Sequence, residues 1–242
     1  MKKIILILTL ILISVSTFAQ TLSDSIHWNT PYYTIDYSEK LEQPKNIWYT
    51  VVCPYGMASR VGMEFYGEEG IKTSDSKDYE ANEWDKGHMV PAASLNCDRN
   101  MLWETFSYMN CALQQQSLNR GVWKKLEMQE REFSKVNNNV KVYIKVEFDA
   151  NPKRVPAGAA IPKGFYKEIT VGERTKFCYY FPNIAPTTSD LNTFKFIDCI
   201  FENCDLSLAN INKVVLREVQ FKDCKMIGLK FDTTDSFSIS IA

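Results

Sequence analysis

Large apolar residues recur at every fifth position along the last part of this 242-residue chain, and no other feature restricts its fold as much. A spacing of five fits neither an α-helix, which repeats every ~3.6 residues, nor a strand, which alternates every two. It predicts a coil that turns a corner every five residues and buries one large and one smaller side chain at each step. The large series is Phe196, Phe201, Leu206, Ile211, Leu216, Phe221, Met226 and Phe231, and the smaller series, two positions earlier, is Phe194, Cys199, Cys204, Ala209, Val214, Val219, Cys224 and Leu229.

This segment resembles the pentapeptide-repeat family, whose chains form a right-handed quadrilateral β-helix with four steps per coil. The resemblance covers about residues 194–231, which amounts to two coils. Two coils leave a stacking face uncovered. We therefore expect that the segment docks on the preceding domain or that the repeat is incomplete. Cys204 and Cys224 lie four steps apart, and we expect them to stack on successive coils with Cα atoms about 4.8 Å apart.

The first nineteen residues have the pattern of a secretory signal peptide. Lys2 and Lys3 precede an apolar run over residues 4–13, and Thr17 and Ala19 place small residues before a cleavage point after Ala19. The apolar run is shorter than the ~20 residues that a membrane span needs. We expect a secreted or periplasmic protein with no membrane contact once residues 1–19 are removed.

Composition narrows the class of protein further. The chain is 45% hydrophobic and 24% charged, as globular proteins are, and its formal net charge of −1 excludes a globally basic nucleic-acid binder but not a local basic patch. Seven cysteines in an exported chain indicate disulfides, and the odd number leaves at least one cysteine unpaired within the chain. The spacing assigns no particular pairing.

Between the signal peptide and the repeat, the pattern predicts one domain of mixed α and β structure. Apolar β-branched and aromatic runs predict strands, and apolar residues at helical spacing predict two helices. The expected strands cover residues 47–53, 140–149 and 174–181, the helices cover about 100–115 and 119–136, and a loop rich in Pro, Gly and Ala at 151–164 is expected on the surface.

Residues that can carry chemistry are few. The chain has two histidines, His27 and His88, and its cysteines lack CxxC spacing, so a zinc site with several histidines is excluded. Asn119, Trp123 and Glu127 are spaced to share one helix face. An amide oxygen backed by a carboxylate suits a hard cation such as Mg²⁺. A histidine base, such a cation and basic side chains are what phosphodiester hydrolysis needs; the basic side chains nearby are Lys86, Arg120, Lys124 and Arg131.

The segment WDKGH, followed by MN and then by LNRGVWKKLEMQER, resembles the sugar-non-specific DNA/RNA endonucleases with a ββα-metal (His-Me finger) site. That family's signature is DRGH followed by a helix motif of the form N-x-G-x-W-x-x-L-E. The resemblance implies an α+β nuclease domain over residues 20–190, with a central antiparallel sheet and flanking helices, ahead of the repeat segment at 191–242. It also implies hydrolysis of DNA and RNA that depends on Mg²⁺, with Mn²⁺ as an alternative.

The family's catalytic roles carry over to matching positions. His88 matches the general base, Asn119 matches the one direct protein ligand of the metal, and Glu127 matches the carboxylate that orients water on the metal. Asp85 resembles the structural carboxylate that opens the motif. Lys86 stands where the family usually has Arg, and a lysine offers a point charge in place of a fork onto two phosphate oxygens.

Four further residues complete the expected site. Asn110 matches a second family asparagine, which orients the histidine. Arg131 matches a basic residue near the substrate, Arg60 matches another in a more divergent stretch, and Arg120 adds a third basic side chain for substrate binding. Leu113 departs from the proline that many relatives have, which affects local backbone shape.

Simpler interpretations exist for the same residues. Trp123 fits a core position, and Lys124 and Lys125 fit a solvated helix face. Glu127 and Glu130 could serve only as helix partners of Arg131 and Lys124. Asn119 could be a helix N-cap, in which case its amide oxygen would not be free to bind a metal.

A non-catalytic binding or scaffold protein is the alternative function, with the repeat as its working part. Some pentapeptide-repeat proteins imitate duplex DNA in shape and charge. Residues 191–242 carry 6 basic and 7 acidic side chains, however, so this segment is hardly acidic.

Overall fold

The structure, a computed structural model, describes residues 24–173, 175–185, 195–197, 200–202, 211, 214–231 and 236–241. The signal peptide expected over residues 1–19 lies outside these ranges. Within them, no helix is long and apolar enough to cross a membrane.

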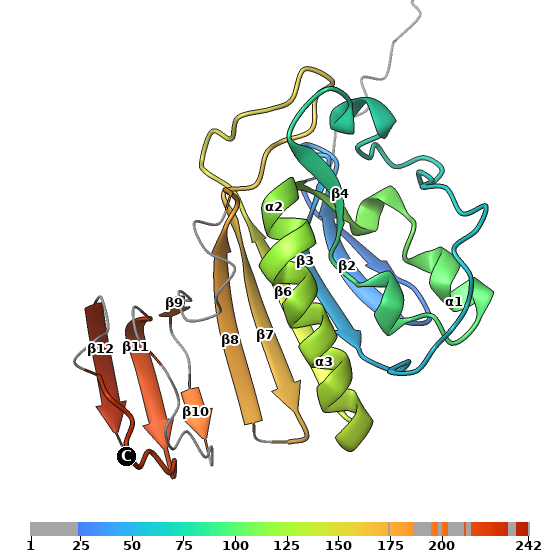
Figure 1. Cartoon of the computed structure of the whole chain (residues 1–242). Coiled ribbons are helices and arrows are strands. Elements are labelled where there is room, and N and C mark those ends of the chain that lie inside the picture. Colours follow the sequence, from blue (N-terminus) through green and yellow to red (C-terminus); the bar gives the residue numbers. More distant parts are fainter. Residues whose placement is uncertain are drawn as a thin grey trace, which may run out of the picture.

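One large sheet organises the described part of the chain (Figure 1). Its strands follow the order β1-β2-β3-β6-β7-β8-β9-β11-β10, with β12 paired to β11, and neighbours from β1 to β9 pair antiparallel. This confirms the expected α+β class with a central antiparallel sheet. The strands of the first part are β1 (Ile26–Asn29), β2 (Tyr33–Ser38), β3 (Gln43–Thr50), β6 (Val140–Glu147), β7 (Gly164–Val171) and β8 (Thr175–Pro182).

A helical stretch covers one face of this sheet. It consists of α2 (Gln116–Leu118), the π-helical turn η4 (Asn119–Trp123) and α3 (Lys124–Val136), which lie over the central strands (Figure 1). Alternate residues of β6 point inward and are buried, and Trp123 packs on Phe165 with ring centroids 5.5 Å apart. The prediction of a helix over 119–136, with Trp123 in the core, is confirmed.

A second, two-stranded sheet lies beside the helical stretch, and its strands form a long hairpin joined by residues 89–110. Strand β4 (Trp84–His88) pairs antiparallel with β5 (Cys111–Gln115), so that His88 lies opposite Cys111. The helix expected over 100–115 is therefore wrong: α1 (Arg99–Glu104) is short, the 3-10 turn η3 (Tyr108–Asn110) follows, and the chain then enters β5. All five β5 residues are buried, and hydrogen bonding to β4 outweighs their helical spacing. Two further 3-10 turns are η1 (Ser76–Tyr79) and η2 (Ala92–Ser94).

The C-terminal strands pair in parallel at an offset of twenty residues. Phe196 in β9 (Lys195–Ile197) lies beside Leu216 in β11 (Val215–Lys222), and Phe201 in β10 (Ile200–Glu202) lies beside Phe221. Twenty residues equal four steps of five. Strand β12 (Ser236–Ile241) continues in parallel on β11, with a one-residue register shift between Arg217 and Val219.

These strands also touch the first domain, because Cys178 on β8 belongs to the same buried cluster as Phe201 and Leu216. Cys204 lies outside the described residues. The quadrilateral β-helix and the spacing of Cys204 and Cys224 therefore stay predictions.

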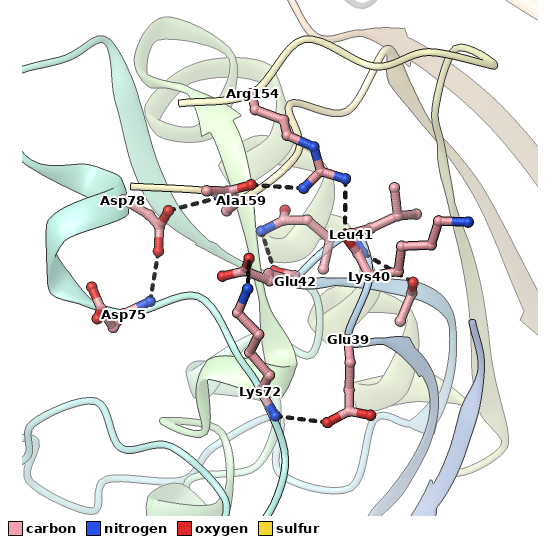
Figure 2. A network of polar contacts seen from close by, with 12 residues as sticks. Glu39, Lys40, Leu41, Glu42, Lys72, Asp75, Asp78, Arg154 and Ala159 are labelled. Atoms are coloured by element: carbon pink, nitrogen blue, oxygen red, sulfur yellow. Dashed lines mark hydrogen bonds and ion pairs between the residues drawn. The ribbon is translucent and has the colours of Figure 1, made fainter. Parts of the chain in front are cut away.

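The loop between β6 and β7 is held in place by polar contacts (Figure 2). Arg154 donates to the carbonyls of Gly158 and Lys40 at 2.7 and 2.9 Å. The backbone N–H of Ala159 donates to the carboxylate of Asp78 in η1 at 3.0 Å. The loop expected on the surface is exposed over residues 151, 153, 154, 156 and 157, while Ala159 is fully buried and Arg154 attaches the loop to the turn between β2 and β3.

A disulfide joins two segments that the cysteine spacing did not pair. Cys53, just after β3, bonds Cys97, just before α1, with Cα atoms 5.4 Å apart and a separation of 44 positions in sequence. The bond connects the chain that leaves the sheet with the chain that enters α1.

We predict that replacing both cysteines (Cys53→Ser with Cys97→Ser) lowers the melting temperature by roughly 10 °C. A loop of this length restricts the unfolded chain by about 4 kcal/mol in the chain-entropy description, and a domain of this size loses ~2–4 °C per kcal/mol. Calorimetry with and without dithiothreitol measures the change. Reductant should lower the melting temperature of the wild type and leave that of the double variant in place; equal sensitivity of both would contradict the assignment.

Candidate active site

Strand β4 carries the WDKGH motif and is packed tightly against its partner strand. A Cβ atom on Gly87 would lie 2.5 Å from the side-chain oxygen of Gln114 and 2.6 Å from its Cβ. Only glycine fits this approach. The motif's glycine therefore permits the close pairing that sets Lys86 and His88 at the end of the hairpin.

Lys86 and His88 are two residues apart on the strand and share one face. Both contact Phe65: the His88 ring centroid lies 5.0 Å from that of Phe65, and the Lys86 ammonium lies 5.1 Å from it. Tyr108 and Tyr79 also surround the ammonium, at 5.5 and 5.8 Å. Three aromatic faces thus stabilise the cation that occupies the position of the family arginine.

The His88 imidazole is held as a neutral ring. Its pKa is lowered from 6.5 to about 4, mainly by burial and also by the positive charge of nearby Arg60, while a hydrogen bond to the Lys86 backbone acts in the opposite direction. Nε2 is buried and has no hydrogen-bond partner among the described residues. The structure thus brings His88, Lys86 and Arg60 together.

Asp85 points toward the helical stretch and joins it to β4. Its carboxylate accepts a hydrogen bond from the Asn119 amide nitrogen at 3.0 Å and a two-point contact from Arg120 at 2.8 and 2.6 Å. With its nitrogen bound to Asp85, the Asn119 amide has its oxygen turned away from that carboxylate. Arg120, expected to bind substrate, first holds Asp85.

Asn119 is not a helix N-cap. The helical stretch is capped by Gln115, whose side-chain oxygen accepts from the backbone N–H groups of Ser117 and Leu118 at 2.7 and 3.1 Å. Asn119 lies one turn further on, where the helix widens and Gly121 leaves helical geometry (φ −100°, ψ −108°). Such π-helical turns occur frequently at functional sites. The alternative role for Asn119 as a cap is therefore wrong.

Glu127 lies in the first turn of α3 and has an altered pKa. Burial raises the pKa of its carboxyl from 4.5 to about 7, while the charges of Lys167 and Arg131 act to lower it and that of Glu130 acts to raise it. The Trp123 indole also lies near the carboxylate, although no well-aligned hydrogen bond joins the two. Arg131 donates to the Glu127 carbonyl at 2.9 Å, so these two predicted residues lie together.

A buried charged group beneath Glu127 was not predicted from the sequence. Lys167 on β7 and Glu130 on α3 form a fully buried ion pair at 2.5 Å, and Glu130 also accepts from the Tyr49 hydroxyl at 2.6 Å. The Lys167 ammonium lies 4.3 Å from the centre of the Trp123 ring. Glu130 therefore does not pair with Lys124. A lysine at an inward position of a strand was the available signal for this group.

Asn110 lies under the hairpin with its amide fully occupied. Its oxygen accepts from the Val90 N–H at 2.8 Å, and its nitrogen donates to the carbonyls of Val90 and Thr105 at 3.0 and 2.9 Å. Val90 follows His88 by two residues. Asn110 thus positions the backbone that carries the histidine and has no group left to face a substrate.

The expected site residues form two groups connected by β4. One contains His88, Lys86 and Arg60; the other contains Asn119 with Arg120 and, one helix turn or two later, Glu127 with Arg131. No group of three or more His, Cys, Asp or Glu side chains in the described part of the chain could hold a metal ion. A metal held by one asparagine and solvent does not require such a group, and the Asn119 amide oxygen is a suitable hard donor.

This arrangement of sheet, hairpin and helix is that of a known class of nuclease. The solved structure of the EndoG/EndoGI complex, described as showing the mechanism of EndoG inhibition, superimposes with a TM-score of 0.63 at 22% identity, covering 69% of this chain and 78% of that one. At this identity the likeness concerns the fold.

The family model of the DNA/RNA non-specific endonucleases matches residues 17–197, which is well over half of the chain. The protein therefore belongs to that family. Similar proteins include the mitochondrial nuclease EXOG of Xenopus laevis, 29% identical over 49% of this chain, and the mitochondrial endonuclease G of Bos taurus, 25% identical over 49% of it. The matched segments span only 37% and 38% of those two relatives.

The low pKa of His88 predicts a loss of stability in acid. The unfolded chain takes up a proton near pH 6.5, whereas the folded protein resists it until about pH 4. The unfolded state thus binds more protons between these values, so the free energy of unfolding falls as the pH drops from 7 to 4. His88→Asn should remove up to about 3 kcal/mol of this dependence.

Urea unfolding at pH 4.5 and 7.5 in the presence of EDTA measures the effect. His27→Asn is the matched control, because His27 is exposed and paired with Asp36 at the edge of the sheet. We expect His27→Asn to lose free energy of unfolding in acid as the wild type does, whereas His88→Asn should lose less. Identical pH dependence in wild type and His88→Asn would show that the histidine is not buried as a neutral ring.

Proposed function

We propose that this protein is an exported, Mg²⁺-dependent endonuclease that hydrolyses phosphodiester bonds in DNA and RNA with little sequence preference. Mn²⁺ is an alternative cation. The observation that carries the proposal is the unpartnered Nε2 of His88, held beside Arg60 and Lys86 on the strand whose Asp85 orients Asn119.

His88 would accept a proton from the attacking water through Nε2. With a pKa of about 4 its ring is neutral at physiological pH, as a base must be. A phosphate seated against Arg60 would cancel part of the charge that depresses this pKa. Binding of the anionic substrate would therefore make the histidine more basic at the moment when it has to take the proton.

The second group of residues supports a cation. Asn119 would hold it through the amide oxygen that Asp85 leaves free, with Glu127 directed to its solvent ligands. When bound, Mg²⁺ would supply positive charge against the phosphate and the leaving 3′ oxygen. The hydrogen bond from Asn119 to Asp85 is the contact that fixes the direction of the amide oxygen.

Basic side chains would hold the substrate backbone. Lys86, positioned by three rings, contributes a point charge, and Arg60 and Arg131 contribute guanidinium groups. The Arg120 side chain is largely exposed and uses only part of its five N–H donors on Asp85, so the rest can face a phosphate. Contacts of this kind do not depend on base sequence.

Two observations support export. The sequence predicts a signal peptide, and the Cys53–Cys97 disulfide is of a kind that persists in oxidising compartments outside the cytosol.

We predict that His88→Asn lowers cleavage of plasmid DNA and of RNA at least 100-fold in Mg²⁺, because proton transfer from water is lost. Gel analysis of supercoiled plasmid checks this, with EDTA abolishing cleavage and rising salt reducing it. His27→Asn is the control and should cleave like the wild type. Intact nucleic acid in wild-type reactions containing either cation would favour the scaffold function instead.

We predict that Asp85→Asn raises the Mg²⁺ concentration needed for half-maximal cleavage by on the order of 10-fold. An amide at position 85 cannot hold both Asn119 and Arg120 as the carboxylate does, and partners of metal ligands have effects of this size. A Mg²⁺ titration of the initial rate measures it. Asp24→Asn, at an exposed position, is the control; an unchanged Mg²⁺ midpoint for Asp85→Asn would contradict the orienting role.

A further inference from the structure

A loop next to the candidate site exposes large apolar side chains to solvent. Tyr55, Met57 and Val61 are 70%, 92% and 81% exposed, and all three lie between β3 and the residues that contact His88. Single exposed apolar residues are common, whereas three within seven residues form a patch that indicates binding.

The loop that carries them is braced. Cys53 is bonded to Cys97, the Ala58 N–H donates to the Asn96 carbonyl at 3.0 Å, and Arg99 donates to the carbonyls of Ser59 and Val61, both at 3.2 Å. The side chains are thus held out into solvent by a fixed backbone. A binding surface that is fixed before binding loses little entropy when it is occupied.

The braced loop borders a hollow of about 730 Å³ lined by residues 52–59 and 97–99. Tyr55 is part of this lining, and the Lys135 ammonium lies over one face of its ring, 5.4 Å from the centroid, while also pairing with the Glu132 carboxylate. The Asp98 carboxylate in this lining is used to cap α1, where it accepts from two backbone N–H groups. The site therefore offers a flat ring, an apolar wall and a cation.

The hollow is linked to the candidate active site through a shared apolar cluster, because Ala58 of its lining packs with Phe65, which contacts the His88 ring. Arg60, whose charge acts on His88, lies five residues after Tyr55, so the two are at most about 18 Å apart. Phe65, further along the same segment, contacts the His88 ring, and Ala58 and Met63 pack with it against the cluster of Phe106 and Leu102. The hollow therefore lies within a few nucleotides' reach of His88.

We propose that the hollow binds a nucleobase of the substrate, a few nucleotides from the bond that is cleaved, by stacking on Tyr55 and packing on Met57 while Lys135 faces a flanking phosphate. A nucleic acid strand presents flat rings alternating with phosphates, which matches a ring placed beside an ammonium. Stacking on an aromatic ring accepts every base and requires an unpaired or splayed strand. This inference rests on the proposed nuclease function and gives it a preference for single-stranded or distorted regions.

Two labelled oligonucleotides of equal length test the proposal, one with bases and one made of abasic sites with the same phosphates. Fluorescence anisotropy in EDTA, where cleavage is suppressed, measures both affinities. The wild type should bind the strand with bases on the order of 10-fold more tightly. Tyr55→Ala should lose this preference, and Tyr55→Phe, which keeps the ring, should retain it. Ile227→Ser, which changes an exposed apolar residue in the turn between β11 and β12, is the matched control and should bind like the wild type.

The outcomes separate the two levels of inference. Cleavage of plasmid by the wild type, together with equal affinity for both oligonucleotides or an undiminished preference in Tyr55→Ala, would overturn the base site and leave the nuclease function standing. A wild type that neither binds nor cleaves nucleic acid would overturn both. Self-association in sedimentation that is lost in Tyr55→Ala, without any base preference, would show that a second copy of the chain occupies the hollow.

Discussion

The contact between the Asp85 carboxylate and the start of the helical stretch holds the candidate site together. Asp85 is fixed by the pairing of β4 with β5, and through Asn119 and Arg120 it ties that hairpin to the helix that covers the central sheet. A backbone hydrogen bond from the Gln116 N–H to the Glu83 carbonyl, just before β4, supports the same junction at 3.1 Å. The Asp85 carboxylate thus contributes to the relative placement of His88 and Asn119.

The core beneath α3 contains a buried ion pair whose desolvation is unfavourable. Lys167 and Glu130 are fully buried, and removing two charges from water is expensive unless they are well paired. The ion pair, the Tyr49 hydroxyl and the Trp123 ring offset part of that loss. The same lysine charge acts on Glu127, whose carboxyl lies one turn away on α3. A polar core of this kind restricts how α3 can sit on the sheet and makes the electrostatics of the site depend on residues that never reach solvent.

Much of the fold and site followed from local sequence, and the exceptions have physical causes. The alternation in 140–149 and the amphipathic pattern in 119–136 depend on near neighbours, and both predictions were confirmed. The stretch 111–115 has helical spacing but forms a buried strand, because its backbone hydrogen bonds are made with residues some 25 positions away. His88, Asn119 and Glu127 were identifiable by motif resemblance. Lys167, Phe65 and the Cys53–Cys97 bond were not, since each acquires its role only when distant segments meet.

The C-terminal strands extend the same sheet past β8, through β9 and onto β11, and their apolar side chains cover Cys178. They thereby shield a border of hydrogen-bonding groups that would otherwise be open to pairing with other chains, which is a recognised route to aggregation. Strand β8 pairs with β9 at Tyr180 and Lys195, so removing the chain from β9 onward would expose this edge and the Cys178 cluster to solvent.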